Sequence, residues 1–175
     1  MIAVFSFLYY YKFMIRKARF TDITAINDIY NYEVINGTAT FDTENRSFLK
    51  AVSYYFNHRS TIHPLFVYEL NNSVVGFCSL SSYRQKTAFR STVEISLYVH
   101  VNHRNKGIGS SLLSYVINYA KKSCEISNIV SVITSENKGS LDLFFKAGFI
   151  KSGSIEKCGR KFNRDLGITN MYLLV

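Results

Sequence analysis

A short glycine-containing loop carries the clearest chemical signal in the sequence. The segment Arg104-Asn-Lys-Gly-Ile-Gly109 joins an alternating apolar stretch to an amphipathic one. A helix N-terminus leaves four backbone N–H groups unpaired and carries a positive partial charge, so it attracts phosphate. Gly107 and Gly109 can take up positive φ angles and let the backbone approach an anion. Arg104 and Lys106 add cationic side chains, so the loop predicts a site for a phosphate-bearing ligand.

Two better-known phosphate loops do not fit this segment. A Walker loop requires Gly-Lys-Ser/Thr, whereas Lys106 precedes Gly107 here. A dinucleotide-binding fingerprint requires a third glycine at the position that Leu112 occupies. The remaining alternative is a tight strand-to-helix turn that binds no ligand. The elements on either side of the loop are needed to choose between this turn and a phosphate site.

The elements on both sides of the loop have clear periodicity. Residues 92–101 alternate apolar with more polar side chains, which predicts a strand with one face in the core. Residues 108–121 have apolar side chains at helical spacing, which predicts an amphipathic helix. The loop is therefore expected to lie at the start of a helix, where phosphate binding requires it. The inward-facing helix residues are Leu112, Leu113, Val116, Ile117 and Ala120.

The rest of the chain predicts further strands and helices. Helical spacing predicts a helix that is capped by Thr21 or Asp22 and ends at Gly37, and two more over residues 46–57 and 140–147. Together these elements predict an α/β (α+β) fold with one mixed, largely antiparallel sheet of about six or seven strands, flanked by about four helices. The remaining predicted strands span residues 15–19, 65–70, 74–80, 129–134, 149–155 and 168–174, with a hairpin turn at Asn71-Asn72. Inward-facing side chains in the first two helices are expected to be Ile23, Ile26, Tyr30, Val34, Phe48, Val52 and Tyr55.

Composition and charge narrow the classes of partner. The 175 residues are 47% apolar and 19% charged, which fits one globular domain. The net charge of +9 favours anions, whether nucleic acid, an acidic membrane surface or a phosphate-bearing cofactor. The basic residues are scattered and form no Arg-rich recognition helix, which argues against nucleic acid. The three cysteines and four histidines lack disulfide or metal-site spacing, so we expect reduced thiols and no metal.

The first thirteen residues are apolar and aromatic but too short to span a bilayer, which needs about 20 apolar residues. They also lack the basic segment and cleavage site of a signal peptide. We therefore treat residues 1–13 as an N-terminal extension or a non-native start. Residues 14–175 are expected to form the working domain of a cytoplasmic protein that does not enter a membrane.

With these elements in place, the loop resembles the R/Q-x-x-G-x-G/A signature of the GNAT superfamily of N-acetyltransferases. The resemblance extends over nearly the whole chain from Met14. Matching superfamily segments are Thr92–Val99, Glu136–Ser140 and Leu143–Phe149. Three stretches are most similar to the phosphinothricin/methionine-sulfone acetyltransferase group: Thr40–Glu44, Thr92–Glu94 and Cys158–Phe162. The resemblance implies the GNAT fold and an acetyl-CoA-dependent N-acetyltransferase.

The resemblance also implies a set of residues that bind acetyl-CoA. In the superfamily, backbone groups of the fourth strand pair with the pantetheine arm, and the signature loop holds the pyrophosphate. Asn137 matches an asparagine that contacts the pantetheine, although it could also act as an ordinary helix N-cap. The implied strand residues are Leu97, Tyr98 and Val99, and the implied loop residues are Arg104, Asn105, Lys106, Gly107, Ile108, Gly109 and Ser110.

Glu94 matches the general base proposed for the subfamily. An ammonium group must lose a proton before it can attack a thioester, so the chemistry needs a base. A carboxylate near an apolar strand can have its pKa raised by desolvation, which brings it closer to working pH. The alternative is a solvent-facing strand residue, because alternation alone also places a polar residue at this position.

The chain departs from the subfamily at three positions. Phe144 stands where many members have a tyrosine or histidine that acts as general acid, and it cannot donate a proton. Lys86 and Phe89 stand where the subfamily often presents Arg and Tyr to an acidic substrate. Recognition of an anionic group on an amino-acid-like substrate is still expected from Lys86 and Phe89. Phe41 is expected to line the same pocket.

The leading interpretation is therefore the acetylation of the amino group of a small amino acid or amine. The first alternative is an N-acetyltransferase that acts on protein N-termini or lysines. The second is a non-catalytic domain that binds or senses acyl-CoA. The resemblance and the apolar C-terminal stretch 171–175 also imply a homodimer.

Overall fold

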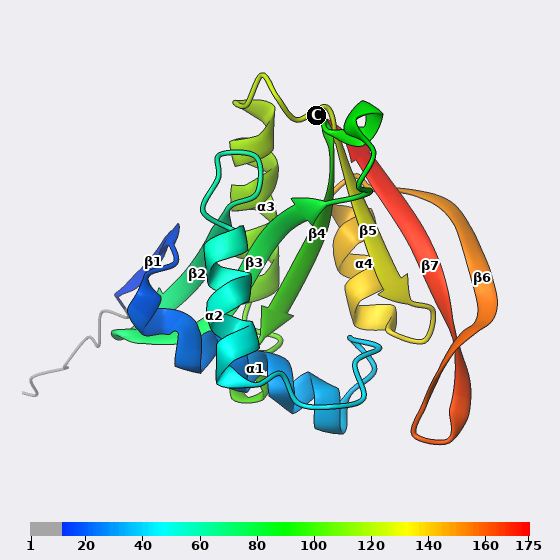
Figure 1. Ribbon diagram of the computed structural model, residues 1–175, viewed down its shortest axis with the longest axis horizontal. Coiled ribbons are helices and arrows are strands. Elements are labelled where there is room, and N and C mark those ends of the chain that lie inside the picture. Colours follow the sequence, from blue (N-terminus) through cyan, green and yellow to red (C-terminus); the bar gives the residue numbers. More distant parts are fainter. Residues whose placement is uncertain (1–11) are drawn as a thin grey trace, which may run out of the picture.

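The computed structural model describes residues 12–175, which form a seven-stranded sheet with four α-helices (Figure 1). The strand order is β1-β2-β3-β4-β5-β7-β6, and every neighbouring pair is antiparallel except β4 and β5. This confirms the predicted mixed, largely antiparallel sheet. The strands are β1 (Phe13–Lys17), β2 (Leu65–Leu70), β3 (Ser73–Ser82), β4 (Thr92–Val99), β5 (Asn128–Thr134), β6 (Ile150–Lys161) and β7 (Arg164–Leu174).

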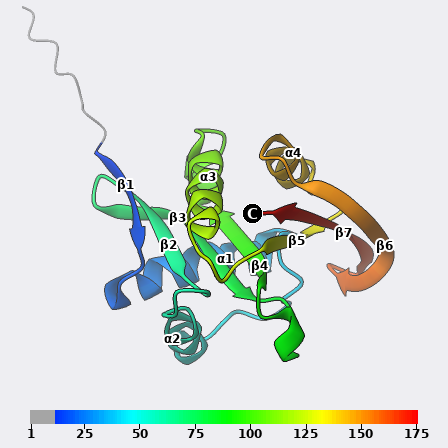
Figure 2. The ribbon, with the colours of Figure 1, turned by 90° about the horizontal axis from the view of Figure 1, so that it is seen from above.

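The helices cover both faces of the sheet (Figure 2). On one face lie α1 (Ile23–Asn36) and α2 (Phe48–Asn57), and on the other lie α3 (Ile108–Lys121) and α4 (Lys138–Lys146). The larger buried cluster packs α3 against the sheet through fully buried residues such as Leu112 and Val116. A smaller cluster packs α1 against β2 and β3. No helix in residues 12–175 has the length and apolar character needed to cross a bilayer.

Most of the predicted elements are present with nearly the expected bounds. The helix predicted over residues 108–121 is confirmed, and Asn71 and Asn72 form the hairpin turn with φ angles of 50° and 63°. The predicted extension lies mostly outside the described residues. Phe13, its last residue, belongs to β1, where it pairs with Leu70.

Two predicted details of the first helices need correction. Asp22 is the N-cap residue of α1, as one of the two predicted candidates, but its side chain makes no capping hydrogen bond, and a 3₁₀ turn over Phe20–Asp22 precedes this helix. The Asp22 carboxylate instead accepts hydrogen bonds from Arg16 at 2.7 and 3.0 Å. Phe48 was predicted to face inward but is 53% exposed, because it is the first residue of α2 and Ala51 is the buried residue of that helix.

The last two strands are longer than predicted. They were expected over residues 149–155 and 168–174, whereas β6 and β7 together extend from Ile150 to Leu174. A tight turn at Phe162 and Asn163, with φ angles of 52° and 58°, joins them. Most residues of β6 are exposed, so this outer strand lacks the alternation that would reveal its length.

The central strands β4 and β5 separate soon after they meet (Figure 1). Their parallel pairing joins only Thr92–Glu94 to Asn128–Val130. Antiparallel neighbours continue on their outer sides, where β3 pairs with β4 and β7 pairs with β5. Two strand edges therefore face each other across a gap in the middle of the sheet.

Residues 37–42, here called the bridging segment, link the strands around this gap. The Tyr98 hydroxyl of β4 donates to Ala39 O at 3.5 Å, and the Thr134 hydroxyl of β5 donates to the next carbonyl back, that of Thr38. Lys161 at the end of β6 is buried, and its Nζ donates to Thr40 O at 2.9 Å. Three separate strands thus hold one short segment in place.

Glu33 of α1 connects this assembly to the loop that follows β4. Its carboxylate is buried and forms an ion pair with Arg104, while its backbone oxygen accepts from Lys161 Nζ at 3.1 Å. A Cβ atom at Gly37 would collide with the Glu33 carboxylate, so a glycine is required where the chain leaves α1. Glu33 therefore positions three parts of the structure together: the loop after β4, the C-terminal end of α1 and the bridging segment.

We predict that Glu33→Gln lowers the free energy of unfolding by about 1–3 kcal/mol, because a neutral amide leaves the Arg104 guanidinium without its partner charge. Urea denaturation of the purified protein measures this change. The matched control is Glu136→Gln, because Glu136 and Arg164 form an ion pair with both side chains well exposed. This second change should cost less than about 1 kcal/mol. Equal costs would contradict the positioning role of Glu33.

Candidate functional site

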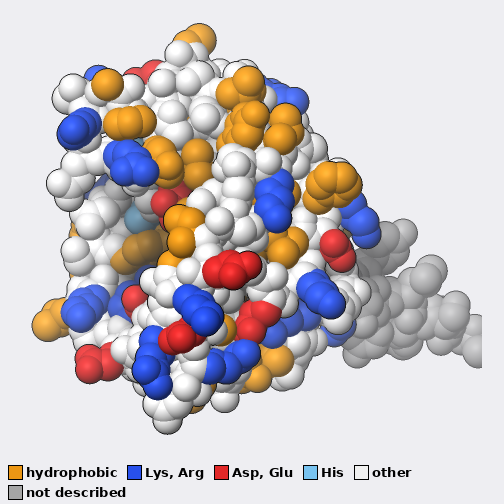
Figure 3. Space-filling model, turned by 90° about the vertical axis from the view of Figure 1, so that its right-hand side faces the viewer, with side chains coloured by type: hydrophobic (Ala, Val, Ile, Leu, Met, Phe, Trp, Pro, Cys, Tyr) orange, Lys and Arg blue, Asp and Glu red, His pale blue; other side chains and the backbone are white. Residues whose placement is uncertain are grey.

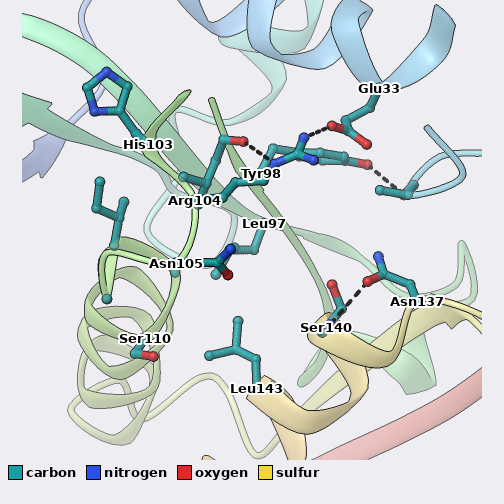
Figure 4. Close-up of a pocket in the computed structure, with 16 residues that line it drawn as sticks. Glu33, Leu97, Tyr98, His103, Arg104, Asn105, Ser110, Asn137, Ser140 and Leu143 are labelled. Carbon is teal, nitrogen blue, oxygen red and sulfur yellow. Dashed lines mark hydrogen bonds and ion pairs between the residues drawn. The ribbon is translucent and has the colours of Figure 1, made fainter. Parts of the chain in front are cut away.

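A cavity of about 300 Å³ lies where the gap between β4 and β5 reaches the start of α3 (Figure 4). The end of β4 and the following loop form one wall, and the first turn of α4 forms the other. The residues predicted to bind the cofactor come together here, apart from Lys106. The cavity is lined by Glu33, Ala39, Leu97, Tyr98, Val99, His103, Arg104, Asn105, Gly107, Ile108, Gly109, Ser110, Asn137, Gly139, Ser140 and Leu143.

The loop presents the N-terminus of α3 to this cavity. Gly107 caps the helix with a φ of 77°, and Asn105 also has a positive φ of 59°. The first helical hydrogen bond runs from Ser111 N to Gly107 O at 3.0 Å, so the preceding N–H groups are free to bind an anion. Gly109 does not need a positive φ, as it lies inside α3. A Cβ there would lie 3.3 Å from Leu143 Cδ2, so this glycine lets α4 approach α3 closely.

The two cationic side chains of the loop have partners within the protein. Arg104 pairs with Glu33, and its guanidinium carbon lies 5.8 Å from the centroid of the Tyr32 ring. Lys106 Nζ donates to Asn102 O at 3.0 Å. Arg104 is therefore offset by the Glu33 carboxylate, whereas Lys106, bonded to a neutral carbonyl, keeps its positive charge beside the helix terminus.

Backbone groups of β4 reach into the gap at alternate residues. His100 N donates to Val75 O of β3 at 2.9 Å, which fixes the direction of the alternation. Because N–H groups alternate sides along a strand, those of Leu97 and Val99 face the gap and that of Tyr98 faces β3. Tyr98 instead contributes its side chain, which also borders the gap.

Asn137 caps α4 and still has an amide nitrogen available. Its Oδ1 accepts from Ser140 N at 3.1 Å, as an N-cap side chain does. The amide nitrogen has no hydrogen-bond partner among the described residues, and the side chain lines the cavity. Capping and ligand binding are therefore compatible at this residue, because they use different atoms.

A second cavity, of about 200 Å³, continues through the gap toward the face covered by α1 and α2. It shares five lining residues with the first cavity, so the two meet between β4 and β5. Phe41 and Glu94 line only the second cavity, and Phe144 closes it from α4. The Phe41 ring packs against β6 at Gly159, where a Cβ atom would collide with it. The shared residues are Ala39, Leu97, Tyr98, Asn137 and Ser140.

Glu94 lies at the last position where β4 and β5 pair. Its carboxylate has no hydrogen-bond partner among the described residues, and burial raises its pKa above the usual 4.5. Tyr98 is the other titratable side chain in the described lining of the second cavity, and burial holds its pKa well above 10. Glu94 is therefore the group in this cavity that can act as a base near neutral pH.

The other two predicted substrate residues lie apart from the cavities. Lys86 and Phe89 belong to a 3₁₀ turn before β4, and neither lines the first or second cavity. Phe89 packs there against Tyr83, with ring centroids 6.0 Å apart. Among residues 12–175, no group of three or more His, Cys, Asp and Glu side chains is placed to hold a metal ion.

Several residues that shape the site were missed from the sequence. Glu33, Ala39 and the Tyr98 side chain line the cavities, yet no local pattern marks them. Glu33 looked like a polar residue on the exposed side of a helix. Its role depends on Arg104, 71 residues further along the chain.

Comparison with known proteins agrees with this geometry. Residues 26–149 match the acetyltransferase (GNAT) family. The chain is 37% identical to the L-amino acid N-acyltransferase MnaT of Escherichia coli over 91% of its own length and 92% of that protein. It is also 37% identical, with the same coverage, to the L-methionine sulfoximine/L-methionine sulfone acetyltransferase of Salmonella typhimurium.

A solved structure extends the likeness to three dimensions. The yncA acetyltransferase of Salmonella typhimurium, solved with its cofactor acetyl-CoA, is 34% identical and superposes with a TM-score of 0.88. The match covers 93% of each chain. The family match spans most of the chain and includes the loop, the gap and the first turn of α4. The chain belongs to the acetyltransferase (GNAT) family and is an N-acetyltransferase.

Proposed function

We propose that this enzyme transfers the acetyl group of acetyl-CoA to the amino group of a small L-amino acid of the methionine sulfone or phosphinothricin type. The observation that carries the proposal is the pair of cavities that meet in the gap between β4 and β5. One cavity presents a helix N-terminus and the other a buried carboxylate. The names of MnaT, an L-amino acid N-acyltransferase, and of the Salmonella L-methionine sulfoximine/L-methionine sulfone acetyltransferase support this substrate class.

The first cavity fits acetyl-CoA by the chemistry of its donors. The free N–H groups of Gly107–Ser110 suit the pyrophosphate. The N–H group of Val99 and the Asn137 amide suit the carbonyl oxygens of the pantetheine arm, which would extend along β4 as an additional strand and leave the Leu97 N–H for the thioester carbonyl. This arm would bring the thioester to the point where the cavities meet.

In the second cavity, Glu94 is the base in the proposed mechanism. Its carboxylate takes a proton from the substrate ammonium, and the resulting amine attacks the thioester carbonyl carbon. The Leu97 N–H faces the gap and can stabilise the negative charge that develops on the carbonyl oxygen. The carbon–sulfur bond then breaks, the nitrogen gives up its second proton to form the amide, and the departing CoA thiolate takes up one proton.

The walls of the second cavity favour a compact acceptor. Phe41 provides an apolar surface, and Phe144 is buried at the base of the cavity on α4. The described lining contains no Lys or Arg. We therefore retain Phe41 as an acceptor-binding residue, whereas Lys86 and Phe89 could contact only a part of the substrate that extends beyond this cavity.

We predict that Glu94→Gln lowers kcat by about 10²–10⁴-fold, because an amide cannot accept the ammonium proton. CoA release, followed with a thiol reagent in the presence of methionine sulfone, methionine sulfoximine or phosphinothricin, measures the change. The dissociation constant of acetyl-CoA should stay the same, because Glu94 lies outside the first cavity. The exposed Glu156 of β6 gives the matched control Glu156→Gln, which should retain full activity.

The wild-type pH profile tests the same role of Glu94. The base must be ionised, so kcat/KM should fall as the pH decreases through the pKa of Glu94. This limb should lie above pH 4.5, because burial disfavours the charged carboxylate and raises its pKa. An unchanged kcat in Glu94→Gln, or a profile without this limb, would refute Glu94 as the base.

Two changes at Asn137 separate its structural role from cofactor binding. Asn137→Asp keeps a good N-cap but removes the amide donor, so stability should hold while the KM for acetyl-CoA rises about tenfold. Asn137→Ala should raise KM similarly and also lower the free energy of unfolding by about 0.5–2 kcal/mol. Steady-state kinetics and urea denaturation measure the two effects. A wild-type KM in Asn137→Asp would show that Asn137 only caps the helix.

The proposed enzyme is a homodimer. β6 is an outer strand of the described sheet and exposes Ile150 and Ile155, and Phe162 in the following turn is exposed as well, each more than half accessible. Figure 3, which faces this side of the molecule, shows apolar side chains among Lys and Arg. Such a strand edge is prone to pair with another chain unless it is covered.

We predict that light scattering gives twice the mass of the chain for the wild type. Ile155→Lys places a charge in the exposed apolar side of β6 and should shift the protein toward the single-chain mass. Leu49→Lys, at an exposed leucine of α2, is the control and should leave the mass unchanged. A single-chain mass for the wild type would contradict the dimer.

A further inference from the structure

A buried histidine at the end of α2 forms two hydrogen bonds with defined directions. His58 is only 9% exposed and follows the last residue of the helix. Its Nδ1 lies 2.6 Å from Tyr54 O, and its Nε2 lies 2.9 Å from Ser81 Oγ. Tyr54 O can only accept, so Nδ1 carries the proton. In the neutral ring, Nε2 then accepts from the Ser81 hydroxyl.

Ser81 lies directly opposite Glu94 in the sheet. The two residues are Cα partners in the antiparallel pairing of β3 and β4. His100 and Val75 form a hydrogen-bonded pair. Such pairs recur at every second position of an antiparallel ladder, and the register between β3 and β4 does not shift. Ser81 and Glu94, an even number of positions away, therefore also form a hydrogen-bonded pair. Their Cα atoms are therefore about 5.5 Å apart, and both side chains project toward the α2 face of the sheet.

The direction of these bonds determines what Ser81 can offer to Glu94. A serine hydroxyl has a single proton, and here that proton is committed to His58. Ser81 can therefore accept a hydrogen bond from the protonated carboxyl of Glu94 but cannot donate one to the ionised form. The arrangement fits a route along which a proton leaves Glu94.

On the other side of Ser81 lies a surface hollow of about 490 Å³. His58, Ser81 and Arg84 line this hollow, whereas Glu94 lines the second cavity. Ser81 therefore lines the surface hollow, while Glu94, its partner across the β3–β4 pairing, lines the cavity that holds the base. His63 also lines the hollow, but its ring makes no hydrogen bond within residues 12–175.

We propose that His58, acting through Ser81, is a positioning residue that carries the proton accepted by Glu94 out to this hollow. The inference rests on the proposed role of Glu94 as the base. Acetylation of an ammonium substrate releases two protons from nitrogen, and the CoA thiolate takes up one, so one proton must leave the enzyme in each turnover. Glu94 passes its proton to the Ser81 oxygen as the Ser81 proton moves to His58 Nε2. The imidazolium then loses that proton to solvent in the hollow, and the Ser81 hydroxyl turns back.

The surroundings of His58 prevent it from retaining the proton. Burial lowers its pKa most, and the nearby charges of His63 and Arg46 lower it further, while the bond to Tyr54 O opposes them. Arg84 on the β3 side of the hollow adds another positive charge. These surroundings disfavour the imidazolium and favour the return of His58 to the neutral form, as a relay requires.

Three variants test the relay in the assay used for Glu94, with the full chain and acetyl-CoA. In His58→Leu and Ser81→Ala, kcat should fall about tenfold, which is part of the roughly 10²–10⁴-fold that acid–base catalysis contributes. The KM for acetyl-CoA should stay the same. Increasing imidazole in the buffer should restore kcat in His58→Leu, because a soluble base replaces the lost exit, and should leave the wild type unaffected. Gln85→Ala is the matched control at another residue that lines the same hollow and should behave as the wild type.

The outcomes separate this inference from the proposed function. A wild-type kcat in both His58→Leu and Ser81→Ala, with activity lost in Glu94→Gln, would overturn the relay and leave the base in place. Full activity in Glu94→Gln would overturn both. If thermal unfolding shows that His58→Leu is not folded, Ser81→Ala becomes the deciding variant for the relay, because removing one oxygen from a strand residue preserves the packing. Acetyl-CoA hydrolysis is also measured without any amine. If Ser81→Ala slows this hydrolysis as much as it slows acetyl transfer, the relay is overturned as well.

Discussion

The site depends on one constraint, which is that β4 and β5 pair over only three residues on each strand. Backbone N–H and C=O groups must find partners, and an early separation leaves those of Leu97 and Val99 facing an opening in the middle of the sheet. A ligand that carries amide groups can satisfy them by lying along β4. The same separation connects the two faces of the sheet, so a cofactor that enters from the α3 and α4 side can meet an acceptor that enters from the α1 and α2 side.

The gap between β4 and β5 lacks strand-to-strand hydrogen bonds that would hold its sides in place. Contacts from α1 and the bridging segment hold them instead. Glu33 holds Arg104 on the cofactor side, and Lys161 holds the Glu33 and Thr40 carbonyls on the acceptor side. A buried ammonium is costly unless it is hydrogen-bonded, so these two bonds fix the end of β6 against the end of α1. The Phe41 wall is therefore held by a set of contacts that also includes the loop after β4.

Local chemistry in the sequence predicted the parts of the site that lie on one element. The strand–loop–helix around Gly107, the N-cap at Asn137 and the apolar face of α3 each follow from spacing within about fifteen residues, and the structure has all of them. What could not be predicted depends on contacts between distant segments. Phe48 looked apolar and therefore buried, but only the packed helix shows that Ala51 faces the sheet. Ser81, His58 and Glu33 are ordinary polar residues until the register of β3 and β4 and the position of Arg104 are known.

The surroundings of Glu94 explain why such a distant pair as His58 and Ser81 would matter. The Glu94 carboxylate has no hydrogen-bond donor among the described residues, and burial raises its pKa, so the protonated form is favoured once it has accepted a proton. Phe144, which lines the same cavity from α4, cannot donate a proton to the departing thiolate. In the proposed mechanism the two protons therefore travel separately: one leaves through Ser81 and His58, and the thiolate is protonated from the cofactor side. A base with a raised pKa can act repeatedly only if its proton has a route to solvent. The fixed tautomer of His58 sets the direction of proton transfer along that route.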